Sequence, residues 1–245
     1  MIYVGIDDTD TLDAPGTNQL ARHLVQELRG EFRGRMILRH QLLEDPRVPC
    51  TKKNGCASIL FDVLESKSDQ GERDDHEAVV SLADKLKRLI LPWCPVGSDP
   101  GLCIATMVPQ PVIEWGLRCQ RELVTQDEAR TLARSENIVL EGLGGTNDGV
   151  IGALAAIGLM ATENDGRVIY RGSTGQDWYD VTGRMEVREI LSRGVDEVLS
   201  IDSGEPLAEG TVNIGKRLRP NYRGGKVVLF VARDEAARWE AVRVI

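Results

Sequence analysis

Two kinds of feature are missing from this 245-residue sequence. None of its five cysteines forms a C-x-x-C pair, and their number is odd, which argues against both a disulfide framework and a zinc ribbon. No uncharged stretch reaches the ~18 residues that a membrane-spanning helix needs, and Asp7 comes before an apolar signal core could form. We therefore expect a cytoplasmic protein with no membrane partner.

An excess of positive charge is also missing. The 30 Lys and Arg residues are outnumbered by 38 Asp and Glu residues, so the net charge is −8. A surface of that sign does not attract phosphate backbones in general, and nucleic acid would have to meet a local basic patch. Residues 47–53 form the clearest such patch. The three histidines are scattered singly, and no Ser-His-Asp or Cys-His pairing is legible.

What the sequence does contain is typical of a globular chain, with 42% hydrophobic and 28% charged residues. Apolar spacing predicts both helices and strands, which indicates an α+β protein of one large domain or two ordinary ones. The expected strands are residues 2–6, 35–43, 56–64, 168–171, 197–201 and 226–232. The expected helices begin at Thr17, cover 76–90, follow a capping box at 125–128, and cover 150–158 and 184–191. The proline-rich residues 92–111 are expected to be irregular.

Three carboxylates, Asp7, Asp8 and Asp10, come directly after the first expected strand. Carboxylates so close together repel one another and must be neutralised by cations, protons or solvent. Mg²⁺ takes oxygen ligands and is typically held by one or two carboxylates together with substrate phosphates. The cluster therefore indicates a magnesium site, and the alternative is an exposed acidic turn.

A glycine-rich loop precedes the apolar helix expected at 150–158. Backbone N–H groups at a helix N-terminus favour phosphate, so this loop is a candidate phosphate cradle. The alternative is a tight turn with close packing, because the loop matches neither a P-loop nor a G-x-G-x-x-G fingerprint. The candidate binding residues are Gly144, Gly145, Thr146, Asn147 and Asp148.

Two lysines and one threonine complete the candidate site. Lys52 and Lys53 could stabilise charge on a transferred phosphoryl group, although paired loop lysines are usually only solvated. Thr17 is, by default, the N-cap of the helix that it begins. From the residue types alone, the candidate catalytic residues are Asp7, Asp8, Lys52 and Lys53, and Thr17 joins them through the family resemblance described next.

Several of these motifs together resemble the archaeal tRNA-Ile 2-agmatinylcytidine synthetase family. The resemblance is carried by the residues at 5–10, Gly16-Thr17, Val48-Pro49, residues 99–101 and the glycines leading into 152–158. It is strongest over residues 1–160 and continues more weakly to about residue 233. The family's kinase-like and ferredoxin-like domains, without its OB-fold and zinc ribbon, are what the resemblance covers.

The resemblance implies an enzyme that uses ATP and Mg²⁺ to phosphorylate a carbonyl oxygen, after which an amine displaces the phosphate. It implies a kinase-like domain over residues 1–160 and a ferredoxin-like domain over 161–245. Asp7, Asp8 and Asp10 match the family's acidic Mg²⁺-ATP loop, and Thr17 falls at its autophosphorylated threonine. The surrounding residue types differ, and Lys53 stands where the family has an arginine, which keeps the charge but removes bidentate geometry.

The favoured function is ATP- and Mg²⁺-dependent phosphoryl transfer that activates a carbonyl or hydroxyl for amine attack, on a substrate that is a small molecule. One alternative is a catalytic subunit that modifies tRNA with a separate RNA-binding partner, since tRNA binding by this chain alone is expected to be weak. The other is a non-catalytic nucleotide-binding regulatory or scaffold protein.

Overall fold

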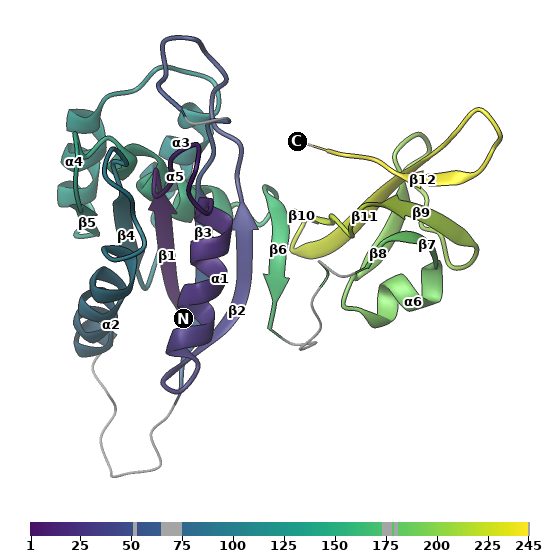
Figure 1. Cartoon of the computed structure of the whole chain (residues 1–245), viewed down its shortest axis with the longest axis horizontal. Coiled ribbons are helices and arrows are strands. Elements are labelled where there is room, and N and C mark those ends of the chain that lie inside the picture. The colour runs from purple at the N-terminus through teal and green to yellow at the C-terminus, as the bar shows by residue number, and fades with distance from the viewer. Residues whose placement is uncertain (51–52, 65–74, 173–177, 179–180, 245) are drawn as a thin grey trace.

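The computed structural model describes residues 1–244 except for 51–52, 65–74, 173–177 and 179–180. Its strands form one twelve-stranded sheet in the order β5-β4-β1-β3-β2-β6-β10-β11-β12-β9-β7, with β8 beside β11. The α+β class expected from the sequence is confirmed. Figure 1 shows two groups of elements along the sheet: an N-terminal lobe from β1 to α5 and a C-terminal lobe from β7 to β12, with β6 between them.

The centre of the N-terminal lobe is built from four antiparallel strands in the order β4-β1-β3-β2. The strands are β1 (Ile2–Asp7), β2 (Phe32–Arg39), β3 (Ala57–Val63) and β4 (Gly101–Ala105), and α1 (Thr17–Leu28) and α2 (Asp75–Ile90) join them. The resulting β1-α1-β2-β3-α2-β4 connectivity is that of a ferredoxin-like split βαβ unit. β5 (Val139–Gly142) extends the sheet beyond β4.

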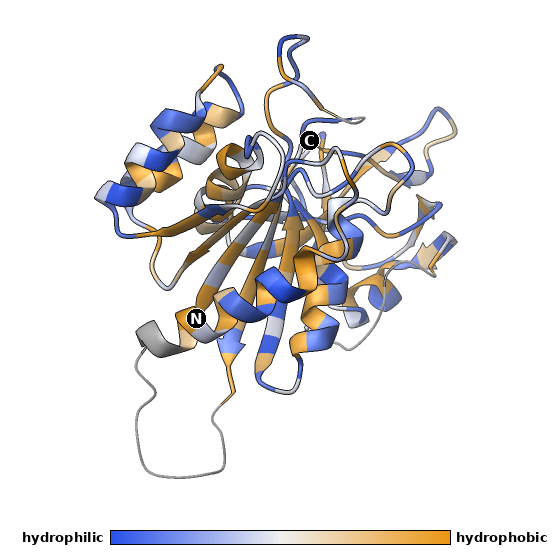
Figure 2. Cartoon of the chain, turned by 60° about the vertical axis from the view of Figure 1, so that its left-hand side comes forward, coloured by the Kyte–Doolittle hydropathy of each residue, from blue (hydrophilic) through white to orange (hydrophobic). Residues whose placement is uncertain are grey.

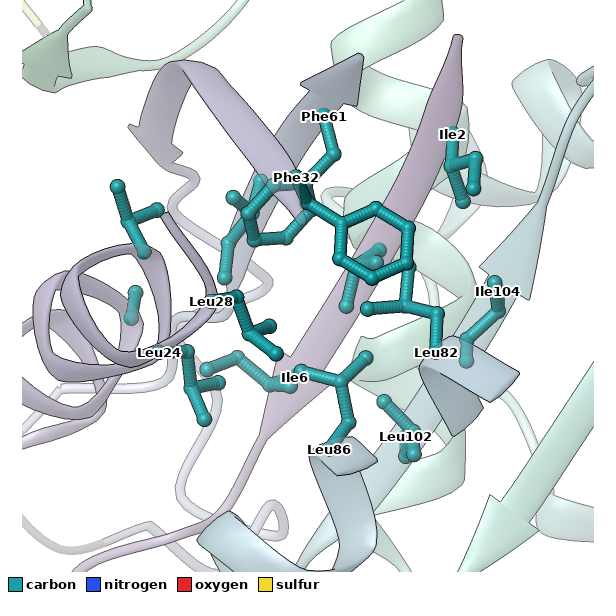
Figure 3. Close-up of a cluster of buried hydrophobic side chains, with 14 of the residues drawn as sticks. Ile2, Ile6, Leu24, Leu28, Phe32, Phe61, Leu82, Leu86, Leu102 and Ile104 are labelled. Carbon is teal, nitrogen blue, oxygen red and sulfur yellow. The ribbon is translucent and has the colours of Figure 1, made fainter. Parts of the chain in front are cut away.

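Side chains along β1 alternate between the two faces of the sheet, and different helices cover each face. Ile2, Val4 and Ile6 are fully buried against α1 and α2, and Phe32 and Phe61 meet edge to face in the same cluster (Figure 3). Because successive strand residues point to opposite faces, Asp7 belongs to the other face. Each large apolar side chain buried in this way contributes about 1.5–3 kcal/mol to folding. The apolar strands and the helices above them are visible as orange and two-coloured ribbons in Figure 2.

The second face of the lobe is covered by α3 (Gln110–Cys119), α4 (Gln126–Ser135) and α5 (Gly149–Ala161). The apolar helix α5 lies so close to β1 that a Cβ atom at Gly5 would overlap the carbonyl oxygen of Ala153. A Cβ atom at Gly152 would overlap the carboxylate of Asp7. The small residues of α5 therefore bring its first turns against the carboxyl end of β1.

The C-terminal lobe is built on a cluster of buried residues such as Trp178, Val198 and Leu229, and this cluster continues into the N-terminal lobe through Leu38 of β2 and Met160 of α5. Its elements are β7 (Gly183–Glu186), α6 (Val187–Ser192), β8 (Glu197–Ser200), β9 (Thr211–Gly215), β10 (Asn221–Arg223), β11 (Lys226–Arg233) and β12 (Trp239–Ala241). β6 (Arg167–Arg171) pairs with β2 on one side and with β10 on the other. This strand joins the lobes into one sheet.

Several elements differ from those expected. β2 begins at Phe32 and ends at Arg39, earlier than the expected 35–43. The proline-rich residues 92–111 contain the buried strand β4. All of the prolines lie outside this strand, but their number in the segment indicated irregular structure. The helix expected at 184–191 is divided into β7 and the short α6.

The division into residues 1–160 and 161–245 stays a prediction. The ferredoxin-like connectivity observed here lies in residues 2–105, and the assignment of a ferredoxin-like domain to residues 161–245 also stays a prediction. Among the described residues, no helix is long and apolar enough to cross a membrane.

Candidate functional site

A cavity of about 1300 Å³ opens where the carboxyl end of β1 meets the first turn of α5. Pockets for single small ligands usually measure ~300–1,000 Å³, so this cavity has room for two ligands. The predicted residues that line it are Asp7, Asp8, Asp10, Thr17, Lys53, Thr146 and Asp148. Gly144, Gly145 and Asn147 do not line it, and Lys52 lies outside the described residues.

Asp7 and Asp8 form the acidic centre of the cavity. Burial, together with the charge of Asp8, raises the pKa of Asp7 to about 7. Burial also raises the pKa of Asp8 to about 6, and the charges of Asp99, Asp10 and Asp148 add to the effect. A bound cation would lower both values, because an opposite charge favours the ionised carboxylate.

Asp99 is an acidic residue of the site that the sequence did not reveal as one. It belongs to the proline-rich residues 92–111 that are expected to be irregular, and in the structure it lines the cavity beside Asp8. Its backbone N–H donates to the Asp8 carbonyl oxygen at 3.1 Å, and its carboxylate accepts from the Thr146 N–H. Asp99 reaches Asp8 because β4 pairs with β1, and that pairing could not be inferred from a segment expected to be irregular.

The acidic residues suit a Mg²⁺ ion that also binds substrate phosphates better than a metal ion enclosed entirely by protein ligands. Within the described part of the chain, no three His, Cys, Asp or Glu side chains converge on one metal position. Mg²⁺ needs only one or two carboxylates when substrate phosphates supply further oxygens. Oxygen donors whose pKa values are raised by burial and mutual repulsion suit that ion, so the prediction of Mg²⁺ at Asp7, Asp8 and Asp10 stands as a prediction.

Thr17 is the first residue of α1, and the N-cap is Gly16 rather than Thr17. The Thr17 hydroxyl accepts a hydrogen bond from Thr9 Oγ1 at 3.0 Å instead of binding the helix backbone. Both threonines are buried, and Thr17 borders the cavity. The default role as N-cap is therefore wrong, whereas phosphorylation of Thr17 stays a prediction.

The glycine-rich loop holds most of its N–H groups on protein acceptors. The N–H of Asn147 donates to Gly144, that of Gly149 to Asp99, and that of Ile151 to Asp148. Gly145 has φ of +60°, and a Cβ atom there would overlap the Asp99 carboxylate. These contacts support the packing alternative, and the cradle of residues 144–148 stays a prediction.

Lys53 lies at the cavity edge with its Nζ 3.5 Å from Glu44 Oε1, and both side chains are exposed. Exposed ion pairs of this kind contribute about 0–1 kcal/mol, so Lys53 is not held in place by it. The same cavity is lined by four arginines that the sequence analysis did not single out: Arg39, Arg167, Arg219 and Arg243. They are far apart in sequence, so only the sheet order could have brought them together.

Comparison with known proteins gives no match to a protein-family model. A curated relative, the tRNA(Ile2) 2-agmatinylcytidine synthetase TiaS of Pyrococcus horikoshii, is 32% identical over 162 residues, which are 64% of this chain and 35% of that protein. The chain is similar to TiaS over part of its length. The family resemblance expected from the sequence is confirmed to that extent, and the chain spans about a third of the length of the curated relative.

Solved structures agree on the fold. The crystal structure of the TiaS–tRNA(Ile2)–ATP complex matches 78% of this chain and 43% of that protein, with a TM-score of 0.55 and 22% identity. A structure described as a tRNA fluorescent labeling enzyme matches 64% and 35%, with a TM-score of 0.53 and 23% identity. The similarity to the first covers more than the N-terminal lobe, because that lobe accounts for fewer residues than 78% of the chain.

Proposed function

We propose that this chain is an enzyme that binds ATP with Mg²⁺ and transfers the γ-phosphoryl group to an oxygen of an acceptor. The observation that carries the proposal is the group of acidic residues at the carboxyl end of β1, Asp7, Asp8 and Asp10, joined by Asp99 and Asp148 at one cavity. A structure of the relative TiaS contains ATP and tRNA(Ile2). Relation to that protein supports ATP as the ligand of this cavity.

Mg²⁺ would be held by Asp7 and Asp8, with Asp10 beside them. When bound, it supplies charge neutralisation and orientation of the phosphates. The protein's own part is positioning: β1 and α5 fix Asp7 through the close contact at Gly152, and the Asp99 N–H fixes the Asp8 carbonyl. Asp8 has φ of +51°, so its backbone turns sharply out of the strand into the cavity.

The proposed reaction has two steps. In the first, an acceptor oxygen attacks the γ-phosphorus, the bond to the bridging oxygen breaks, and ADP leaves. In the second, an amine attacks the activated carbon, the carbon–oxygen bond breaks, inorganic phosphate leaves and the amine loses a proton. A complex of TiaS with tRNA(Ile2), AMPCPP and agmatine supports an amine as the second substrate.

The acceptor that we propose is a small molecule that fits the remainder of the 1300 Å³ cavity. The net charge of −8 favours no general contact with RNA. A tRNA substrate delivered by a separate RNA-binding partner is the second candidate, which the fold similarity to tRNA complexes of TiaS favours.

Calorimetry with ATP and Mg²⁺ tests the nucleotide site. Asp8→Asn should weaken ATP binding about tenfold or more, because it removes one charge from the cation site. Asparagine tolerates the positive φ at this position, so the backbone is preserved. Asp13→Asn is the matched control, since Asp13 is an exposed acid of the same loop that does not line the cavity.

Binding without a divalent cation, or equal binding by Asp8→Asn and Asp13→Asn, would contradict the proposal and leave an acidic turn. ADP formation is then measured with agmatine in the presence and absence of tRNA. ADP formation that requires tRNA would favour tRNA as the acceptor over a small molecule.

A further inference from the structure

The cavity that holds the acidic residues is also lined by a group of arginines, which we call the arginine wall: Arg39, Arg167, Arg219 and Arg243. The acidic residues are already assigned to the nucleotide. The arginines come from β2, β6, the segment before β10 and the C-terminal tail, so they bring together both lobes. Figure 1 shows the C-terminal tail reaching into the space between the lobes.

The sheet register places two of the arginines on one face. Arg39 of β2 pairs directly with Arg167 of β6, and Arg167 pairs directly with Asn221 of β10. Directly opposite residues share a face, so Arg39, Arg167 and Asn221 lie on the same one, and Arg219 comes two residues before Asn221. All of these residues line the cavity, which confirms the face toward which they point.

Asp165 also lines the cavity. Its Oδ1 accepts from His40 Nδ1 at 2.6 Å, and its Oδ2 accepts from Gln120 at 3.0 Å. Arg39 lies close enough to Asp7 to lower the pKa of that carboxyl, so it connects the acidic residues with the arginine wall.

The wall is held in place by buried groups. Asn221 is 3% exposed, and its side-chain amide donates to the Val244 carbonyl oxygen at 3.0 Å. That bond fixes the tail residue next to Arg243. His40, which is fully buried, holds Asp165 two residues before Arg167. Positioned arginines present several N–H donors in a fixed geometry that matches phosphate oxygens.

We propose that the arginine wall binds a phosphate group of the acceptor substrate. The inference rests on the proposed function, because it takes the acidic residues as the ATP site. The shared chemistry is a phosphate ester, which could be the monoester of a small nucleotide or the diester of an RNA backbone.

The experiment compares three probes on the full-length chain saturated with Mg²⁺ and AMPCPP: cytidine, cytidine 5′-monophosphate and the dinucleotide CpC. The two phosphate-bearing probes differ from cytidine in the feature that the wall would recognise. We expect at least one of them to bind about tenfold or more tightly than cytidine, with a preference that weakens as salt increases. Preference for the monophosphate indicates a small nucleotide, and preference for CpC indicates an RNA backbone.

Two variants test whether the arginine wall causes the preference for phosphate. Arg243→Ala removes an exposed side chain, so the fold is preserved, and Arg219→Gln removes charge while keeping most of the side chain. Each should reduce the preference for phosphate about fivefold or more. Lys216→Ala is the control, because Lys216 is an exposed cation of the segment before β10 that does not line the cavity.

Three results would overturn the inference. The first is a wild-type chain that binds cytidine as tightly as both phosphate-bearing probes. The second is an unchanged preference in Arg243→Ala and Arg219→Gln. The third is a loss of Mg²⁺-ATP binding in these variants equal to that in Asp8→Asn, which would assign the arginines to the nucleotide's own phosphates. Failure of the wild-type chain to bind Mg²⁺-ATP is a separate result, and it contradicts the proposed function.

Discussion

Gly144 and Gly145 are neighbours in sequence, but a side chain would meet different surroundings at each. At Gly144, the nearest atom to an added Cβ is Pro100 Cδ at 3.8 Å, which is an ordinary contact. At Gly145, the backbone has φ of +60°, and the added atom would overlap the Asp99 carboxylate. The same carboxylate accepts the Thr146 N–H, so the loop and the acidic residues share one contact.

Gly145→Ala should therefore lower the free energy of unfolding by about 1–3 kcal/mol, through backbone strain and displacement of Asp99. Gly144→Ala should change it by less than about 0.5 kcal/mol. Urea unfolding of both variants measures the difference. If Gly145→Ala is as stable as Gly144→Ala but loses ATP, the loop is a phosphate cradle rather than a packing turn.

Helix α4 begins with a capping box that the sequence predicted and the structure confirms. The Thr125 hydroxyl accepts from the Glu128 N–H, and the Glu128 carboxylate accepts from the Thr125 N–H. Thr125→Ala should cost about 1 kcal/mol of stability, because it leaves an N–H of the first turn without its acceptor. Thr131→Ala, in the middle of the same helix and exposed, is the control. Equal midpoints in urea would show that the cap contributes nothing.

The start of β6 is fixed to the end of β2 through Asp165 and His40. Burial raises the pKa of Asp165, but the hydrogen bonds from His40 and Gln120 outweigh it, so the pKa lies below the ordinary value of 3.8. A carboxyl whose folded-state pKa is depressed stabilises the fold above its unfolded-state pKa, and that contribution is lost as the pH falls through the folded value.

Asp165→Asn should thus be less stable than the wild type at pH 7, and the difference should shrink as the pH falls below about 4. Thermal unfolding of both proteins across pH 3 to 7 measures it. The exposed Asp13→Asn serves again as the control. A constant difference at every pH would mean that the asparagine acts through shape and not through charge.

The elements that the sequence predicted well are those whose signals are local. The β-branched run of β1, the capping box of α4 and the apolar run of α5 each appear within a few residues of where they were expected. β4 was missed because the prolines and glycines around it indicated a loop. Its burial between β1 and β5 depends on strands that are distant in sequence.

The candidate site shows the same limit. Asp7, Asp8 and Asp10 are adjacent in sequence and could be predicted from it, and the structure places them at one cavity. The arginine wall could not be predicted, because Arg39 lies more than a hundred residues before the other members and meets Arg167 only through the pairing of β2 with β6. Neither Asp99 nor Asp165 could be foreseen, because their roles depend on tertiary contacts.

At the scale of the whole molecule, charge sets the expected interaction with RNA. With a net charge of −8, the isolated chain should bind total tRNA no more tightly than the ~10⁻⁴ to 10⁻⁶ M of non-specific contact at physiological salt. The basic residues 47–53 and the arginine wall offer few contacts, so the salt dependence should be shallow. Filter binding at two salt concentrations decides this. Sub-micromolar, steeply salt-dependent binding would instead support tRNA as the acceptor.

The junction between β6 and β10 is narrow. Only Asn221 and Arg167 are paired in register there, with backbone hydrogen bonds from Val168 to Pro220 and from Tyr222 to Gly166 on either side. Few backbone hydrogen bonds hold this junction, and a buried apolar cluster that contains Leu38 and Met160 as well as Val168 and Val227 spans it. A ligand on the arginine wall would contact both sides of the junction. Binding would then clamp the lobes together, and the amide protons of Val168 and Tyr222 would exchange with solvent more slowly when the acceptor is bound.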